Sequence, residues 1–502
     1  MFLRSALAWH ACFHRSFVRS QAPVGCLPHT VSFATAADAP LHFCVVGSGP
    51  AGFYATDRLL KRFGDAVRVT LLDRLPTPFG LVRSGVAPDH PDTKNVINHF
   101  GQWAQDPRVE FVGNVTVGRD VQLTDLRRFY NAVILSYGAE SNRQLNVPGR
   151  ELKGTLSARE FVWWYNGHPE YRHLPIDLSA THAVAICGLG NVAIDCARIL
   201  LRCPDELAKT DIAEHALAQL RQSAVKEVHL IGRRGPVQAA FTPKELRELL
   251  TLPGLQVHID PQMLQLSPVD ELEVKSTRMK RRVLEIITKA ASASPKGTTD
   301  RHLHLHFLRT PAGILGDEEG GVSGLRLEQN ELQVGQTGLG QRAVGTGRFE
   351  ELKADLVLES IGYRSVPLDG VPFDQDAGIV PNELGRVLGG SSGSQPYERG
   401  LYVSGWVKRG PTGIIGTNLV DAGITVECIV EDAMASALPT VPANDCGAQA
   451  LVAAIQDHGK QVVSFADWQK IDAAEVERGK AVGKPREKFT DVDEMLAVCK
   501  EQ

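Results

Sequence analysis

The chain has 502 residues, 43% of them hydrophobic and 22% charged, with 54 Lys and Arg against 58 Asp and Glu. This length exceeds what one hydrophobic core ordinarily supports and predicts two domains in a globular protein. No run of 18 apolar residues occurs, which excludes a membrane-spanning helix, and the slightly acidic balance gives no reason to expect a nucleic-acid partner.

The first 37 residues contain no Asp or Glu, three arginines, and many Ser, His and Ala. This composition is typical of a mitochondrial transit peptide, and the apolar run is too short for a secretory signal; a disordered tail is the alternative. Removing three arginines from 54 basic residues leaves 51 against 58 acids, a formal charge of −7. We therefore expect a matrix protein, attached to a membrane peripherally at most, on which any basic surface is local.

The first predicted element is a buried strand at residues 42–46, followed by the loop Gly47-Ser48-Gly49-Pro50-Ala51-Gly52. Apolar residues then recur at helical spacing as far as Phe63, and a second strand occupies residues 67–72. In such a βαβ unit the first glycine permits a tight turn. The second lets a pyrophosphate approach the backbone, and the third lets the helix pack on the strand. The helix N-terminus holds the phosphates.

Asp73 follows the second strand, 21 residues after Gly52. A carboxylate at this place accepts hydrogen bonds from an adenosine ribose and repels a 2′-phosphate. We therefore expect FAD or NAD at the first loop, rather than NADP. A strand–helix turn without a ligand is the alternative.

A second loop, Gly188-Leu189-Gly190-Asn191-Val192-Ala193, follows a predicted strand at residues 183–186 and opens a helix. The next strand, residues 228–231, runs into Arg233 and Arg234, where a ribose-binding acid would otherwise stand. Because guanidinium groups suit the 2′-phosphate of NADP(H), the second loop is expected to bind this nucleotide. Solvated surface arginines are the alternative.

The glycine spacing alone carries little information, because 47 glycines in 502 residues give about 0.4 chance matches to the three-glycine pattern. Residues 338–343 have the spacing of the second loop, but they follow polar residues and precede no apolar helix. We expect a surface turn there. The strand before each loop and the residue after the next strand therefore distinguish the two nucleotide sites.

The remaining chain is less regular. Residues 260–355 carry glycine and charge runs and are predicted to form hairpins, and residues 355–363 to form a buried strand that returns the chain to the first domain. A strand at residues 401–406 precedes a glycine-rich turn and a helix from about Leu419. Residues 389–394 are predicted to be a flexible loop.

Nine cysteines are scattered along the chain and form no C-x-x-C pair. The clustered thiolates of structural zinc and Fe–S sites are therefore missing, as is the dithiol loop of flavin disulfide reductases. We expect no metal site, and no Ser/His/Asp arrangement is apparent.

Several long motifs resemble the adrenodoxin reductase family, the mitochondrial NADPH:ferredoxin reductases, over nearly the whole chain beyond residue 37. They lie at residues 78–91, 192–200, 232–236, 405–413 and 483–488. The resemblance implies an α/β fold of two Rossmann-like domains of the glutathione-reductase type. The FAD domain would comprise residues 38–141 and 364–502, and the NADP domain, residues 142–363, would be inserted between them. We expect a monomer.

The same resemblance implies two sets of cofactor contacts. The set expected at non-covalently bound FAD is Gly47, Gly49, Ala51, Gly52, Asp73, Leu81, Val117, Trp406, Gly413, Ile414 and Ile415. The set expected at NADP(H) is Gly188, Leu189, Gly190, Asn191, Val192, Arg233, Arg234, Glu245 and Gly413. Asp73 is a departure, since relatives carry Glu there, and this bears on the affinity for FAD more than on its identity.

The implied reaction passes a hydride from NADPH to FAD and then single electrons to an acidic, adrenodoxin-like [2Fe–2S] ferredoxin. That ferredoxin would serve cytochromes P450, Fe–S cluster assembly or both. His90 and Asp195 are the polar residues expected nearest the cofactors, as candidate catalytic residues; a structural role is the alternative for each.

A basic surface is expected to receive the acidic ferredoxin. We assign it to Arg247, Lys280, Arg281 and Arg282, with a solvated helix face as the alternative.

Three other functions are weighed against this one. The missing cysteine pairs argue against a flavin disulfide reductase, and the missing N-terminal cysteine clusters argue against an NADPH-oxidising subunit that feeds glutamate synthase. A flavoprotein scaffold without turnover is the third, and it predicts flavin absorbance but no NADPH oxidation.

Overall fold

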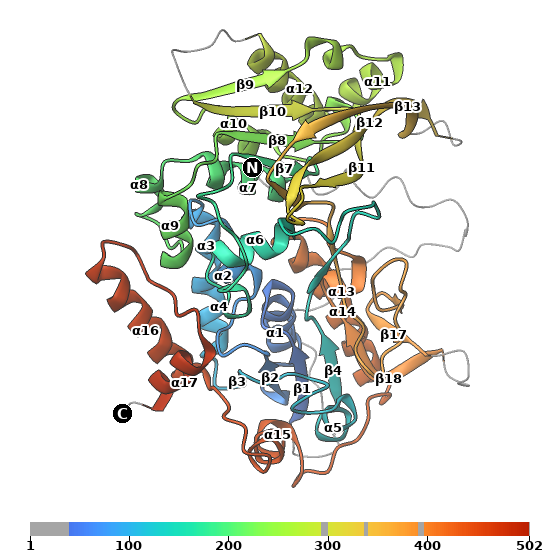
Figure 1. The fold of residues 1–502 in the computed structure, drawn as a ribbon. Helices are drawn as coiled ribbons and strands as arrows, with labels where there is room; N and C mark the ends of the chain where they lie inside the picture. Colours follow the sequence, from blue (N-terminus) through green and yellow to red (C-terminus); the bar gives the residue numbers. More distant parts are fainter. Residues whose placement is uncertain (1–39, 293–299, 336–339, 390–395, 501–502) are drawn as a thin grey trace.

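The computed structural model describes residues 40–292, 300–335, 340–389 and 396–500. It contains two large β-sheets whose strands are mostly or wholly parallel, each with helices packed on it, and Figure 1 shows the two bodies one above the other. The predicted class of two Rossmann-like α/β domains is confirmed. The expected transit peptide, residues 1–37, lies outside the described residues, and so does most of the predicted loop at 389–394.

The first sheet combines strands from both ends of the chain. Its order is β16 (Asn382–Glu383), β17 (Arg386–Leu388), β18 (Tyr397–Val403), β4 (Ala132–Leu135), β1 (Leu41–Val46), β2 (Val67–Leu72) and β3 (Val109–Val112). From β18 to β3 neighbouring strands are parallel. Alternate β1 residues face opposite layers, as the period of a strand dictates. Phe43 and Val45 pack with α1 (Pro50–Phe63) and α14 (Thr417–Met434), whereas Cys44 and Val46 pack with α5 (Leu123–Phe129) and α15 (Gly447–Gln456).

The second sheet is wholly parallel. Its order is β6 (Thr155–Ser157), β14 (Leu356–Glu359), β7 (Ala183–Cys187), β8 (Glu227–Ile231), β10 (Arg301–His306) and β9 (Leu255–Ile259). One face buries Val228 and Leu230 under helices, among them α6 (Ala158–Tyr165), α7 (Asn191–Leu201), α10 (Pro243–Leu250) and α12 (Arg278–Ala291). The opposite face packs partly on an antiparallel sheet of β11 (Arg309–Gly316), β12 (Val322–Val334) and β13 (Gln341–Lys353).

The remaining elements are short or lie at the ends of the chain. The other helices are α2 (Leu81–Ser84), α3 (Pro91–Lys94), α4 (Val96–Ala104), α8 (Pro204–Leu207), α9 (Glu214–Arg221), α11 (Pro268–Ser276), α13 (Trp406–Arg409), α16 (Phe465–Ala481) and α17 (Val492–Lys500). No helix in the described ranges is long and apolar enough to cross a membrane.

The chain crosses between the two bodies twice, and the crossings lie side by side. Outgoing strand β5 (Ser141–Asn142) pairs antiparallel with returning strand β15 (Tyr363–Arg364). The predicted domain boundaries, 141/142 and 363/364, both fall within this ribbon. The first body therefore takes its strands from both ends of the chain, with the second body between them.

The C-terminal tail forms a further contact between the bodies. The Lys488 ammonium donates to the Asn166 carbonyl and lies 3.1 Å from the Asp211 carboxylate. Burial lowers the pKa of Lys488 to about 7, with Asp211 opposing the shift. Lys484 bonds Glu214 at 2.8 Å. The basic segment at residues 480–488 thus includes two buried lysines at this contact.

The structure differs from the sequence prediction in three places. Residues 260–355 contain helices α11 and α12 and strand β10 in addition to the predicted hairpins. The predicted strand at 401–406 ends at Val403, and Trp406 begins helix α13. The surface turn expected at residues 338–343 is wrong from Gln341 onwards, because strand β13 begins there; residues 338 and 339 lie outside the described residues.

Candidate functional site

The first glycine loop forms the turn that its sequence predicts. Gly47 has a φ of +107°, and a side chain there would meet the Ser136 carbonyl oxygen at 2.6 Å. A Cβ at Gly52 would meet the Gly47 carbonyl oxygen at 2.0 Å, so helix α1 packs directly on the turn. At Gly49, the N-cap of α1, a Cβ would have nothing within 4 Å, and the helix has no side-chain cap. The helix therefore presents free N–H groups to open space, which is the requirement for binding a phosphate.

Asp73 lies where β2 ends, close to this loop. One carboxylate oxygen accepts hydrogen bonds from the Ser48 backbone N–H, at 2.9 Å, and from the Ser48 hydroxyl. The other accepts from the Leu75 N–H at 3.0 Å. Asp73 therefore fixes the first glycine loop through its bonds to Ser48, a role that its position in the sequence does not indicate. It also lines a cavity.

A cavity of about 370 Å³ opens at the carboxyl ends of strands β1, β2, β4 and β18. In parallel α/β sheets this edge is where ligands bind. Nine of the eleven residues expected at FAD line it: Gly47, Gly49, Ala51, Asp73, Leu81, Val117, Trp406, Ile414 and Ile415. Gly52 and Gly413 are not among the lining residues.

One wall of the cavity comes from the turn after β18. Trp406 stacks on Tyr363, with ring centroids 5.4 Å apart, and its indole N–H donates to the Thr412 carbonyl at 3.2 Å. Gly413 has a φ of +85°, a conformation that favours glycine. Next to it, Ile414 is 72% exposed although it is apolar and lines the cavity.

Several lining residues were not identified from the sequence. Residues 136–140 follow β4 and reach the cavity as Asp73 does, from the end of a parallel strand, so the strand itself was the available signal. Trp163 and His168 reach it from the second body. Their rings stack on each other at 4.4 Å, and no local pattern in the sequence indicates that they meet the first body.

The cavity fits a flavin dinucleotide on the evidence of its own residues. An uncapped helix N-terminus faces a cradle that a side chain at Gly49 would fill. A carboxylate lies at the ribose position, and an exposed apolar side chain lies at the far end with Trp406. The helix N-terminus matches the pyrophosphate, the carboxylate matches the adenosine ribose, and the apolar side chains match the flat ring.

The second loop repeats the local geometry of the first. Gly188 has a φ of +142°, and a side chain there would meet the Ser360 carbonyl oxygen at 2.1 Å. Gly190 caps α7 without a side-chain bond and has open space around its side-chain position. Asn191 accepts from the Thr242 N–H at 2.9 Å, and the Leu189 carbonyl accepts from the Ala240 N–H at 2.8 Å. The loop is thereby fixed against the segment that precedes α10.

Arg233 and Arg234 follow β8 after a single residue, Gly232, and both are exposed. Their backbone carbonyls are anchored: that of Arg233 accepts from the Asn330 amide at 2.8 Å and that of Arg234 from the Leu308 N–H at 3.1 Å. The backbone is thus fixed while the guanidinium groups extend into solvent. This arrangement suits a phosphate that arrives from outside.

His90, Asp195 and Glu245 lie together at the contact between the bodies, outside the cavity lining. The His90 ring bonds Glu248 at 2.7 Å and lies 3.5 Å from Glu245. Buried Arg198 bonds Asp195 at 2.8 Å. Burial raises the pKa of Asp195 to about 6, against the opposing charge of Arg198.

The residues assigned to partner docking lie on two adjacent helices. Arg247 is exposed on α10, and Arg281 and Arg282 are exposed on α12, which packs against α10. Lys280 forms an ion pair with Glu273 and is half-buried. Three of the four assigned charges are therefore accessible.

Comparisons with known proteins agree with this geometry. Residues 45–110 match the family described as NAD(P)-binding Rossmann-like domain. The chain is 50% identical over 473 residues to NADPH:adrenodoxin oxidoreductase of Arabidopsis thaliana, covering 93% of this chain and 97% of that one. It is 48% identical to the Bos taurus protein of the same name, covering 92% and 93%. The structure of Mycobacterium tuberculosis FprA in complex with NADPH superposes with a TM-score of 0.84 and 41% identity, covering 92% and 100%.

Proposed function

The chain belongs to the NADPH:adrenodoxin oxidoreductase family, and on this premise we propose that it oxidises NADPH and passes electrons through FAD to a [2Fe–2S] ferredoxin. The observation that carries the proposal is that one chain has two glycine loops and that different residues follow the next strand in each case. Asp73 follows the strand after the first loop, whereas Arg233 and Arg234 follow the strand after the second. The first excludes a 2′-phosphate and the second attracts one, so the nucleotides have separate places.

FAD, when bound, can accept a hydride and release electrons one at a time. Both properties are needed because NADPH donates two electrons together, whereas a [2Fe–2S] ferredoxin accepts one. The chain contributes binding and orientation. The N–H groups at the start of α1 bind the pyrophosphate, and Asp73 receives the ribose hydroxyls. Trp406, Ile414 and Ile415 cover the ring and exclude water.

The second loop holds NADPH in the same manner, through the N–H groups at the start of α7, while Arg233 and Arg234 hold the 2′-phosphate. We assign Gly413 to the nicotinamide end. His90 and Asp195 are proposed to border the reacting rings, where a carboxyl with a pKa of about 6 holds or releases a proton near neutral pH.

We place the protein in the mitochondrial matrix, as a monomer attached to a membrane peripherally at most, because the relatives are named mitochondrial and the first 37 residues are typical of a transit peptide. Its ferredoxin is proposed to supply cytochromes P450, Fe–S cluster assembly or both. Asp73 in place of Glu is proposed to change the affinity for FAD rather than the identity of the cofactor.

The function is tested by measuring NADPH-dependent reduction of cytochrome c with purified protein, with and without a [2Fe–2S] ferredoxin. We expect the rate to depend strongly on ferredoxin. Equal rates in both assays would reject the proposal, and flavin absorbance without any turnover would favour the scaffold function.

The docking surface is tested by charge reversal at Arg247. R247E is expected to raise the KM for ferredoxin and leave NADPH oxidation by a small dye unchanged, because a surface charge acts on partner encounter. R221E, which reverses an exposed arginine on α9, serves as the matched control. Equal losses of R247E in both assays would contradict a docking role.

A further inference from the structure

Strand β10 carries three histidines at alternate positions, His302, His304 and His306. Because alternate residues of a strand share one face, all three lie on the same side of the second sheet. The neighbouring strands add His229 and His258, each directly opposite His304 in the parallel register. Five imidazoles are thus gathered on three adjacent strands, although the nucleotide sites use none of them.

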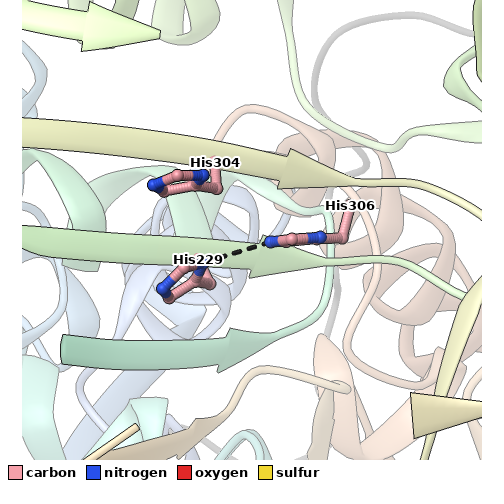
Figure 2. A group of neighbouring side chains, drawn as sticks. All are labelled: His229, His304 and His306. Carbon is pink, nitrogen blue, oxygen red and sulfur yellow. Dashed lines mark hydrogen bonds between the residues drawn. The ribbon is translucent and has the colours of Figure 1, made fainter. Parts of the chain in front are cut away.

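Three of these rings converge. One ring nitrogen from each of His229, His304 and His306 lies within 4.8 Å of those of the other two. Figure 2 shows the His306 ring directed towards His229, with His304 above them. His229 Nδ1 and His306 Nε2 are 3.1 Å apart, and the His229 and His304 ring centroids are 4.5 Å apart.

The hydrogen bonding of this group is incomplete. A single proton serves the contact between His229 and His306, since one ring nitrogen donates and the other accepts. The Nε2 atoms of His229 and His304 are buried without a hydrogen-bond partner. That of His304 is the one available to a bound group, because that of His229 lies 3.5 Å from the Glu227 carboxylate. A buried polar atom without a partner calls for an explanation, and a bound water or ion is one that accounts for it.

The charged groups around the triad are compatible with a cation. The Glu227 carboxylate lies 3.5 Å from His229 Nε2, the position of a carboxylate that orients a metal-bound histidine. Arg309 lies near His306, but its charge is paired with Glu350 at 2.6 Å.

We propose that His229, His304 and His306 form a binding site for a divalent transition-metal ion, which we identify as zinc. Neutral imidazole is a ligand that Zn²⁺ prefers, whereas Mg²⁺ and Ca²⁺ prefer oxygen. Two imidazole nitrogens about 2.0–2.1 Å from a tetrahedral ion lie about 3.4 Å apart. The 3.1 Å contact between His229 and His306 is already close to this spacing. When the ion binds, the proton between these two nitrogens moves to the other nitrogen of its own ring, so both rings stay neutral.

The site has a route of access and an open coordination position. His304 and His306 line a cavity of about 430 Å³ on the side away from β8. Three histidines leave the fourth tetrahedral position to water from this cavity. The His306 carbonyl accepts from the Gly232 N–H at 2.8 Å. Because Gly232 directly precedes Arg233, the histidine site adjoins the arginine pair.

The test uses the full-length chain with FAD bound, without a polyhistidine tag and stripped by a chelator. Zinc is titrated in competition with a chromophoric chelator of micromolar affinity, and X-ray absorption reports the ligand atoms. We expect one equivalent of tightly bound zinc with nitrogen neighbours at about 2.0–2.1 Å. No stoichiometric binding, or sulfur neighbours from the scattered cysteines, would overturn the proposal.

Variants separate the triad from its neighbours. H304Q and H306Q are expected to weaken zinc binding at least about 100-fold. H302Q is the matched control: His302 bonds His258 through a similar ring contact of 3.0 Å but lies outside the triad, so its affinity should stay within twofold of wild type. Retained flavin absorbance in each variant shows that it has folded, and an equal loss in H302Q would contradict the assignment.

Discussion

Arg233 and Arg234 are the residues on which the choice between NADPH and NADH depends. Both guanidinium groups are exposed, while their backbone carbonyls are fixed by Asn330 and Leu308. Such a pair needs little reordering when a 2′-phosphate arrives, because an arginine fork is already suited to phosphate. NADH has no group for these side chains, so their removal should affect the two nucleotides unequally.

We predict that R233A and R234A each raise the KM for NADPH about 10-fold or more and change that for NADH little, since a charge-assisted hydrogen bond contributes about 1.5–3 kcal/mol. Steady-state dye reduction with either nucleotide measures this. R348A, at an exposed arginine of β13, is the control. A parallel rise for both nucleotides would place the arginines elsewhere than at the 2′-phosphate.

At the scale of elements, the two glycines that flank the start of α1 differ in what a methyl group would meet. At Gly49 it would enter open space, and at Gly52 it would meet the Gly47 carbonyl oxygen at 2.0 Å. The first glycine therefore leaves room for a ligand, whereas the second is required for helix α1 to pack on the turn that follows strand β1.

We predict that flavin-free G49A folds with nearly wild-type stability, because Gly49 has an ordinary φ of −79° and a methyl group there meets no protein atom. G49A should nevertheless lose FAD, because the methyl group occupies the space left for the ligand. G52A should lose both FAD and about 1–3 kcal/mol of folding stability through overpacking. Chemical unfolding of the flavin-free proteins and flavin content after gel filtration measure the two effects. Equal unfolding midpoints for G49A and G52A would refute the distinction.

Local elements could be predicted where adjacent residues in the sequence mark the start and end of each element. A strand, a glycine loop and an apolar helix are adjacent in the chain, so the turns at Gly47 and Gly188 followed from the order of residues. Helix α12 was missed although Val283 and Ile287, its buried residues, have helical spacing, because charged residues dominate that segment. The alternating histidines of β10 were visible too, but nothing local indicates that β8 would bring His229 beside them.

At the scale of the molecule, the cavity depends on contacts that no local pattern encodes. Trp163 and His168 belong to the second body and reach the flavin cavity of the first. The domain boundaries proposed from the family resemblance stay a prediction, although both fall in the ribbon of β5 and β15.

Acid should destabilise the whole molecule through histidines that are buried in the neutral form. Burial lowers the pKa of His215 from 6.5 to about 4, despite its bond to the Trp164 carbonyl, and lowers that of His168 well below 6.5. Below pH 6.5 the unfolded chain takes up protons that the folded chain does not. Stability is therefore full above pH 6.5 and falls as the pH decreases towards about 4.

We predict that H215Q reduces the proton uptake on unfolding by about one at pH 5, because glutamine can still donate to the Trp164 carbonyl but does not titrate. Denaturant unfolding at pH 7, 6 and 5 measures the slope. An unchanged slope in H215Q would show that His215 is protonated in the folded protein.

The position of β4 in the first sheet has a consequence during synthesis of the chain on the ribosome. Leu135 pairs with Val403, so one edge of β4 has no partner until the intervening residues have been synthesised. At about 5–20 residues per second this takes about 13–54 seconds. Throughout that time an apolar strand edge is open to wrong partners, which makes it a natural target for a chaperone. The sheet that the ribosome begins first is thus completed only after the sheet inserted within it.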